Sequence, residues 1–160
     1  MKFEYEISQP EFMEMAWYRH RSSIRWSIGV AVGILGFVSG ILFYQYADHW
    51  VGGFTITISI FLLLMQFVIP TAAFRRAYRR NRKMFGKRVV TITDSGIQSD
   101  HELGRSEATW NMYEKFRESP RLFLLFQTAD LIGILPKRVF SSPGDIEGFR
   151  DLLASKIPQK

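Results

Sequence analysis

Apolar and polar positions are distributed unevenly along this chain and divide it into parts. The stretch 26–74 contains no lysine or arginine and one acidic residue, Asp48. A short polar connection around Asp48 separates two apolar runs, 26–47 and 51–74. Each run is long enough, as a helix, to cross about 30 Å of hydrocarbon. We therefore predict a transmembrane helical hairpin over residues 26–74.

After a basic segment at 75–88, the pattern changes to short apolar runs separated by turn residues. Such spacing is typical of an antiparallel meander, so we predict a small β-domain over residues 89–160. The expected strands are 89–93, 97–99, 106–110, 122–126 and 131–135, and the expected turns are 94–96, 100–104, 119–120 and 128–130. Residues 112–117 fit either a further strand or a helical turn, and the sequence leaves this open.

A helix is expected at the end of this domain. Ser142, Pro143 and Asp145 supply an N-cap, a proline at the first helical position and an acidic residue in the first turn. The apolar residues that recur at helical spacing after them are Ile146, Phe149, Leu152, Leu153 and Ile157. Their common face should cover the open side of the sheet.

The N-terminal part, residues 1–25, predicts a strand followed by a juxtamembrane helix. Apolar and charged residues alternate over 2–7, which is the period-two pattern of a strand with one buried face. A lone strand is unstable, so we expect it to pair with the sheet of 89–160. A capping box formed by Ser8 and Glu11 should begin the helix. Together these parts predict an α+β membrane protein.

The formal net charge of +6 is concentrated beside the second apolar run. Residues 75–88 carry +8, whereas 1–25 are neutral and 89–160 carry −1. This location agrees with the positive-inside rule and with attraction to anionic headgroups better than with a nucleic-acid-binding face. We therefore expect a lipid bilayer, and no nucleic acid, as partner. The residues expected to contact anionic lipid are Arg75, Arg76, Arg79, Arg80, Arg82 and Lys83.

The same charges orient the hairpin. Arginines precede the first run and basic residues follow the second, while the loop at Asp48 has none. The positive-inside rule then places both termini in the cytoplasm and the Asp48 loop outside. This is the expected topology of a multi-pass protein of the cell inner membrane.

Small residues line one side of the first apolar run. Gly29, Gly33, Gly36 and Gly40 are spaced so that they fall nearly on one line along a helix. Such a stripe permits close helix packing, either against the second run of the same chain or against another chain in a homo-oligomer. The short connection at Asp48 forces an antiparallel hairpin, which favours packing within the chain.

The sequence carries no motif for catalysis. The chain has no cysteine, and its three histidines are scattered without paired metal-ligand spacing, so we expect no metal site and no cofactor. It has neither a Gly-x-Ser-x-Gly motif nor a phosphate-binding loop, and we predict that it is not an enzyme. Lys137 and Arg138 follow a predicted strand and are candidates for contact with a ligand or partner, although a solvated basic pair is the simpler explanation.

Several short sequence segments follow the two apolar runs and the basic linker in a characteristic order. They are Val89–Thr93 with 94–97, the stretch 107–110, Leu122–Leu125, Pro136–Phe140 and Phe149–Leu153. In this order they resemble the bacterial YcxB-like membrane proteins. The resemblance implies a pleckstrin-homology-like (PH-like) sheet capped by the C-terminal helix, with residues 2–7 as a candidate seventh strand. It implies no activity for individual residues.

These features lead to two functional hypotheses. The first is an integral inner-membrane protein whose hairpin anchors a cytoplasmic PH-like domain that binds a protein partner or a membrane component. The second is an accessory subunit of a membrane transport or stress-response complex, assembled through the glycine face of the hairpin.

Overall fold

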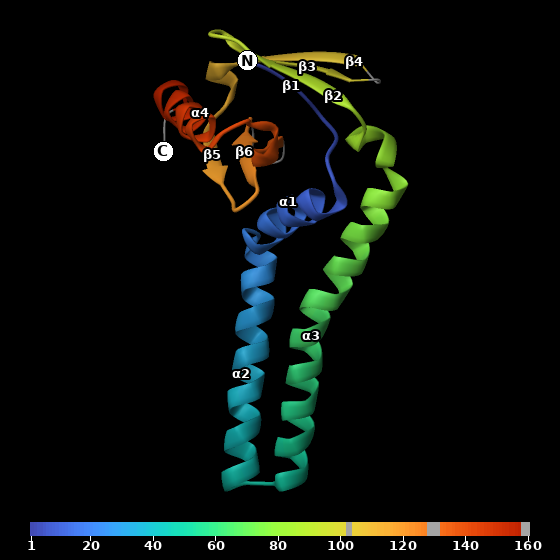
Figure 1. The fold of residues 1–160 in the computed structure, drawn as a ribbon. Coiled ribbons are helices and arrows are strands. Elements are labelled where there is room, and N and C mark those ends of the chain that lie inside the picture. Colours follow the sequence, from blue (N-terminus) through green and yellow to red (C-terminus); the bar gives the residue numbers. More distant parts are fainter. Residues whose placement is uncertain (102–103, 128–131, 158–160) are drawn as a thin grey trace. The chain divides into compact units, whose positions relative to one another are not determined.

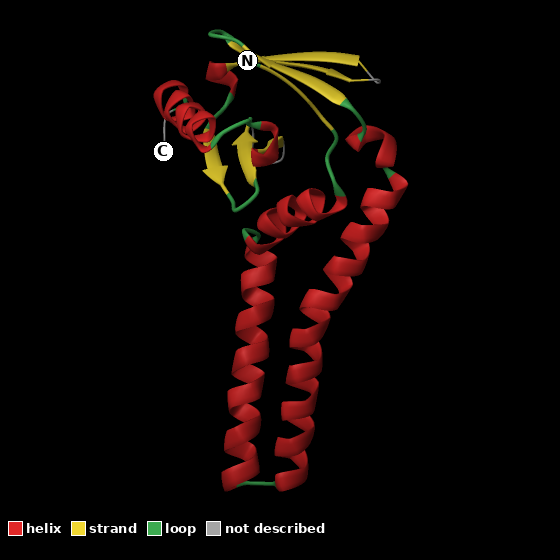
Figure 2. Cartoon of the chain, in the orientation of Figure 1, coloured by secondary structure: helices red, strands yellow, loops and turns green. Residues whose placement is uncertain are grey.

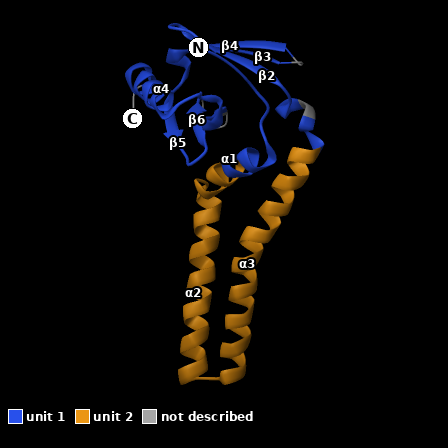
Figure 3. Cartoon of the chain, viewed as in Figure 1, with its two compact units in different colours: residues 1–15, 80–160 blue, residues 16–79 orange. Residues whose placement is uncertain are grey.

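A computed structural model describes residues 1–101, 104–127 and 132–157 of the chain. Within these residues the protein is α+β, with four α-helices and seven strands in two antiparallel sheets (Figure 1, Figure 2). The chain forms two compact units, the first comprising residues 1–15 and 80–160 and the second residues 16–79 (Figure 3). The N-terminal strand therefore belongs to the same unit as the C-terminal part of the chain.

The second unit is built on a hairpin of two long helices. Helix α2 (Ile24–Tyr46) begins after the N-cap Ser23, whose hydroxyl accepts a hydrogen bond from a backbone N–H of the first turn. Helix α3 (His49–Arg80) begins after Asp48, whose carboxylate accepts hydrogen bonds from two backbone N–H groups at 2.8 and 3.1 Å. The one acidic residue of the apolar stretch thus caps a helix end that would otherwise leave donors unsatisfied.

Both helices are long and apolar enough to cross a membrane. Their large apolar side chains are largely exposed; Leu35 and Phe54, for example, are 66% and 68% exposed. Helix α3 continues past residue 74 to Arg80, so the start of the basic segment is helical, and a short 3-10 helix, η1 (Arg82–Phe85), follows it.

Helix α1 (Gln9–Arg21) precedes the hairpin and shows the expected capping contact. The Glu11 carboxylate accepts a hydrogen bond from the Ser8 N–H at 2.8 Å. The second half of α1 belongs to the second unit, where the Trp17 ring lies 5.8 Å from the rings of both Phe67 and Phe74 of α3.

The first unit contains both sheets. The larger sheet has the order β1-β2-β3-β4 and the smaller has the order β5-β6-β7. The strands are β1 (Lys2–Tyr5), β2 (Arg88–Ile92), β3 (Gly96–His101), β4 (Gly104–Thr109), β5 (Lys115–Glu118), β6 (Leu122–Phe126) and β7 (Ile132–Pro136). Strand β1 pairs antiparallel with β2, which confirms the predicted pairing of the N-terminal strand with the C-terminal domain.

The turns between strands follow the sequence signals where the structure describes them. Residues 93–95 join β2 to β3, and 119–121 join β5 to β6. The sequence leaves residues 112–117 undecided between a strand and a helical turn. In the structure they are neither, because a short 3-10 helix, η2 (Trp110–Met112), ends within them and β5 begins within them. The turn expected at 128–130 lies outside the described residues. The turn expected at 100–104 lies partly outside them, and β3 continues as strand to His101.

The core of this unit lies between the smaller sheet and helix α4 (Pro143–Lys156). All five residues of β6 are buried, and Phe149, Leu153 and Ile157 are fully buried from the helix side. The Phe123 ring of β6 lies 5.1 Å from the Phe149 ring at a steep angle, an edge-to-face contact. The N-cap predicted at Ser142 is confirmed, and the Asp145 side chain completes a reciprocal capping box that starts α4.

Candidate functional site

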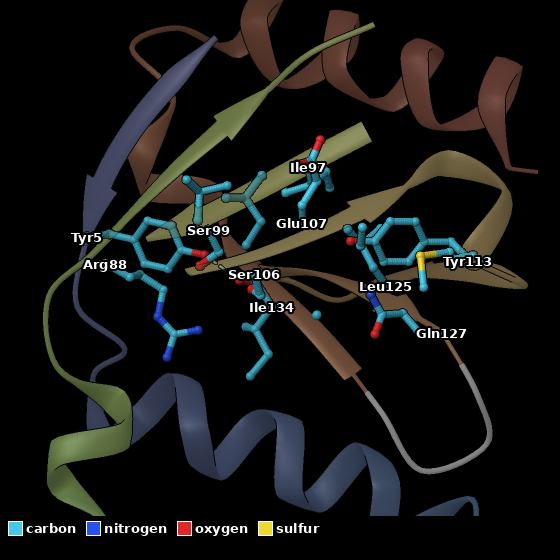
Figure 4. A pocket seen from close by; sticks show the side chains of 15 residues that line it. Tyr5, Arg88, Ile97, Ser99, Ser106, Glu107, Tyr113, Leu125, Gln127 and Ile134 are labelled. Carbon is cyan, nitrogen blue, oxygen red and sulfur yellow. Dashed lines mark hydrogen bonds between the residues drawn. The ribbon is translucent and has the colours of Figure 1, made fainter. Parts of the chain in front are cut away.

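A pocket of about 300 Å³ lies between the two sheets of the first unit (Figure 4). One wall comes from the larger sheet, through β1 to β4, and the other from β6 and β7 of the smaller sheet. Figure 4 shows Tyr5 and Arg88 at one end of the pocket and Tyr113 and Gln127 at the other. Its size is at the lower end of the range that small-molecule sites occupy in proteins.

The strand register explains which side chains reach the pocket. Tyr5, Arg88 and His101 are direct partners across β1, β2 and β3, and Ser99 and Ser106 are partners across β3 and β4. All of these except His101 line the pocket. Directly opposite residues of an antiparallel pair project from the same face of the sheet. The larger sheet therefore presents a patch of polar side chains on its inner face.

Two nitrogen atoms in this patch are buried without a partner. Among the described residues, neither Nε of Arg88 nor Nδ1 of His101 has a hydrogen-bond partner. The Arg88 guanidinium does donate from its Nη2 to the Met84 carbonyl at 2.8 Å. Buried polar atoms are nearly always hydrogen-bonded, so these two nitrogens mark the inner face as a place where a bound group can be accommodated.

The tyrosines of the pocket are held neutral. The Tyr5 hydroxyl donates a hydrogen bond to the Ile134 carbonyl at 2.6 Å and so links the two sheets. Burial raises the pKa of Tyr5 to about 12. Burial also raises the pKa of Tyr113, although a hydrogen bond with Gln127 opposes this shift. Neither phenol supplies a negative charge to the pocket at neutral pH.

Lys137 and Arg138, the candidate contact residues, have partners within the first unit. The Lys137 ammonium lies 2.6 Å from a carboxylate oxygen of Glu118. Arg138 donates from Nε and Nη2 to the two carboxylate oxygens of Glu11, at 2.7 and 3.2 Å, and from Nη2 to the Glu6 carbonyl at 2.6 Å. Both residues therefore hold strand and helix ends together in this structure.

The sequence predicts Glu11 only as a capping residue, yet the structure buries this charged residue. Burial by itself would raise its pKa, but hydrogen bonds from Arg138 and Ser8 outweigh that effect and lower the pKa. The sequence gives no signal for this contact, because its two partners are 127 residues apart.

The basic residues after the second apolar run are exposed on the helix. Arg75, Arg76, Arg79 and Arg80 stand on the last turns of α3 at spacings that put them on one side of it. Arg82 is exposed on η1, and Lys83 belongs to the same 3-10 helix. None of the five arginines among them lines the pocket between the sheets.

The glycine stripe of α2 faces α3 of the same chain. A Cβ atom added at Gly33 would lie 2.5 Å from the Leu63 side chain, and one at Gly36 would lie 2.6 Å from the Ser59 hydroxyl. At Gly40 it would lie 2.9 Å from the backbone nitrogen of Ile56. Gly29 similarly lies against the Gln66 side chain. The four glycines thus allow the two helices to approach closely.

The residues that line the pocket differ in chemical type. Within the described residues no group of three histidine, cysteine, aspartate or glutamate side chains could hold a metal ion. The pocket combines a cationic side chain, the hydroxyls of two serines and two tyrosines, and apolar side chains.

Comparison with known proteins identifies the C-terminal part. Residues 92–153 match the family model of the YcxB-like proteins. The family resemblance expected from the sequence is confirmed. The matched segment runs from the end of β2 to within α4 and contains most of the pocket residues, although Tyr5, Arg88 and Val90 lie before it. No curated protein and no solved structure matches the chain.

Proposed function

We propose that this protein is an integral membrane protein of the bacterial inner membrane whose hairpin anchors a cytoplasmic, PH-like binding domain, and that it is not an enzyme. The observation that carries the proposal is the apolar surface of the hairpin. Only 11% of the most apolar window of each helix is buried. An apolar surface of this extent is unfavourable in water and favourable in lipid.

The distribution of charge supports the orientation. Basic residues flank the hairpin at both chain ends, and the arginines on the last turns of α3 are exposed where they can contact anionic headgroups. Each basic residue near an anionic membrane surface contributes about 1 kcal/mol to such attraction.

The architecture of the first unit supports a PH-like binding domain. Two antiparallel sheets of four and three strands, followed by one amphipathic C-terminal helix, agree with the fold that the family resemblance implies. The alternative, an accessory subunit assembled through the glycine face, has less support because α3 of the same chain already lies against those glycines.

Cysteine labelling tests the topology, since the chain has no cysteine of its own. Asp48→Cys is avoided because it would remove the cap of α3, so the reporter is Tyr46→Cys, at an 82% exposed side chain next to the loop. A membrane-impermeant maleimide should label Tyr46→Cys in intact cells, and it should label the matched variant Asp94→Cys, in the β2–β3 turn, only after the membrane is opened. Labelling of Asp94→Cys in intact cells, or release of the protein by alkaline carbonate, would refute the proposal.

A further inference from the structure

We infer that the pocket between the sheets binds a small amphipathic anion, with its negative group beside Arg88 and its apolar body against Leu125 and Leu135. The inference deepens the proposed function, on which it rests, by naming the class of ligand that the binding domain takes. It uses only residues of the first unit, so it can be tested separately from the membrane topology.

The charge of the inner face points to an anion. Within the described residues Arg88 forms no ion pair, and its Nε has no acceptor. The nearby Glu11 carboxylate is already paired with Arg138 at 2.7 Å. An anion at Arg88 would satisfy a buried donor and neutralise a charge at the same time, which makes a charge-assisted hydrogen bond the strongest contact available there.

The Glu107 carboxylate does not neutralise the positive charge of Arg88, although Glu107 borders the pocket. It is the register partner of Gln98, and both alternate with the inward-facing Ser99 and Ser106. Because successive side chains of a strand point to opposite faces, the Glu107 carboxylate belongs to the outer face. There it accepts a hydrogen bond from the Gln98 amide at 3.1 Å.

The hydroxyls of Ser99 and Ser106 add to the polar side. They are partners in the β3–β4 register, and Val90, the direct partner of Ser99, stands two residues from Arg88 on the same strand face. Serine hydroxyls can donate to the same negative group that the guanidinium contacts.

The opposite wall is apolar and sets the size of the ligand. Leu125 of β6 and Leu135 of β7 border the pocket from the smaller sheet and share its inner face, because each stands two residues from the other's register partner. A volume of about 300 Å³ corresponds to roughly ten atoms the size of a water molecule. A carboxylate on a short alkyl or aryl body fits this description.

The test is calorimetric titration of the full chain in dodecyl maltoside micelles with octanoate, protein-free micelles being the blank. We expect saturable binding of octanoate and at least tenfold weaker binding of the uncharged octanamide. Arg88→Met should weaken octanoate binding at least tenfold. The matched control is Arg105→Met, which removes an arginine from the outer face of β4, where it contacts Asp100 at 3.4 Å; its Kd should equal that of the natural chain.

A second variant keeps the test valid if Arg88→Met fails to fold. Ser106→Leu places an apolar side chain in the pocket from an exposed position and should abolish octanoate binding while far-UV circular dichroism stays unchanged. Oleate in phosphatidylcholine vesicles is then tested as a competitor of octanoate. Competition would show that the acid can come from the membrane, and failure to compete would indicate a soluble acid. The contact between Arg88 and the carboxylate is the same in both cases. Absence of saturable binding, or equal binding by the natural chain and folded Arg88→Met, would overturn the inference and leave a water-filled pocket. The labelling experiment on Tyr46→Cys is independent of either result.

Discussion

Glu11 and Arg138 form an ion pair in the first unit. Loss of the arginine should destabilise this unit far more than loss of the carboxylate charge. The Glu11 side chain is 5% exposed, whereas that of Arg138 is 54% exposed. Arg138→Met would leave a buried carboxylate that retains its contacts with Ser8 alone. Glu11→Gln would leave a guanidinium that is half in water and can be hydrated.

The magnitude follows from this asymmetry. Removing one partner of a fully buried pair costs about 3–5 kcal/mol. Because water reaches the pair from the Arg138 side, we expect Arg138→Met to destabilise the first unit by about 2–3 kcal/mol and Glu11→Gln by about 1 kcal/mol. The double variant should be less destabilised than the sum of the two, since each single change removes the same contact.

Hydrogen exchange with mass spectrometry measures this effect within one unit of the full chain. Peptides from β6 and α4 should exchange faster in Arg138→Met than in Glu11→Gln, while peptides from α2 keep the exchange rate of the natural chain. Arg121→Met is a suitable control, since the Arg121 side chain is exposed and its contact with Glu14 comes from the backbone N–H. Equal protection in Arg138→Met and Glu11→Gln would refute the reasoning that a buried carboxylate depends on its partner.

Three further outcomes are expected. Hydrogen bonds from an arginine and a lysine lower the pKa of Glu118 from 4.5 to about 2. The ionised carboxylate therefore stabilises the fold by about 1 kcal/mol after solvent screening, and this stabilisation is present above pH 4.5 and lost between pH 4.5 and 2. Glu118→Gln should remove this pH dependence of unfolding. Gly52→Ala would place a Cβ 2.5 Å from the Tyr44 Cα, whereas Gly53→Ala meets nothing within 4 Å, so only the former should lower the melting temperature of the hairpin helices in detergent. Tyr5→Phe should cost about 1 kcal/mol in urea unfolding, because it removes the hydrogen bond to the Ile134 carbonyl of β7; an unchanged midpoint would contradict that role.

Local patterns were sufficient to predict most elements of this fold. The apolar runs predict α2 and α3 because twenty uncharged residues in sequence leave few alternatives to a long helix. The cap at Ser142 and the alternation at 2–7 predict α4 and β1 for similarly local reasons. Even the pairing of β1 with the C-terminal sheet followed, because a strand with one apolar face must be covered.

The pocket and its charges could not be predicted, because they depend on register and on long-range contacts. Arg88 counts in the sequence as one more positive charge beside the membrane, yet it begins β2 and stands opposite Tyr5. The division into two sheets also has no local signal in the sequence, because it occurs at η2, between two ordinary strands. A shift of one residue in the β2–β3 register would turn His101 to the outer face.

The hairpin and the pocket are linked by the order of the chain. Tyr5 precedes α2 and α3 and Arg88 follows them, yet the two residues are direct partners across β1 and β2. A chain that crosses a bilayer twice returns to the side from which it left, and only then can these strands pair. An odd number of crossings would separate them and remove one end of the pocket. With the proposed topology, the two-helix hairpin therefore allows β1, which lies before it, to pair with β2, which lies after it.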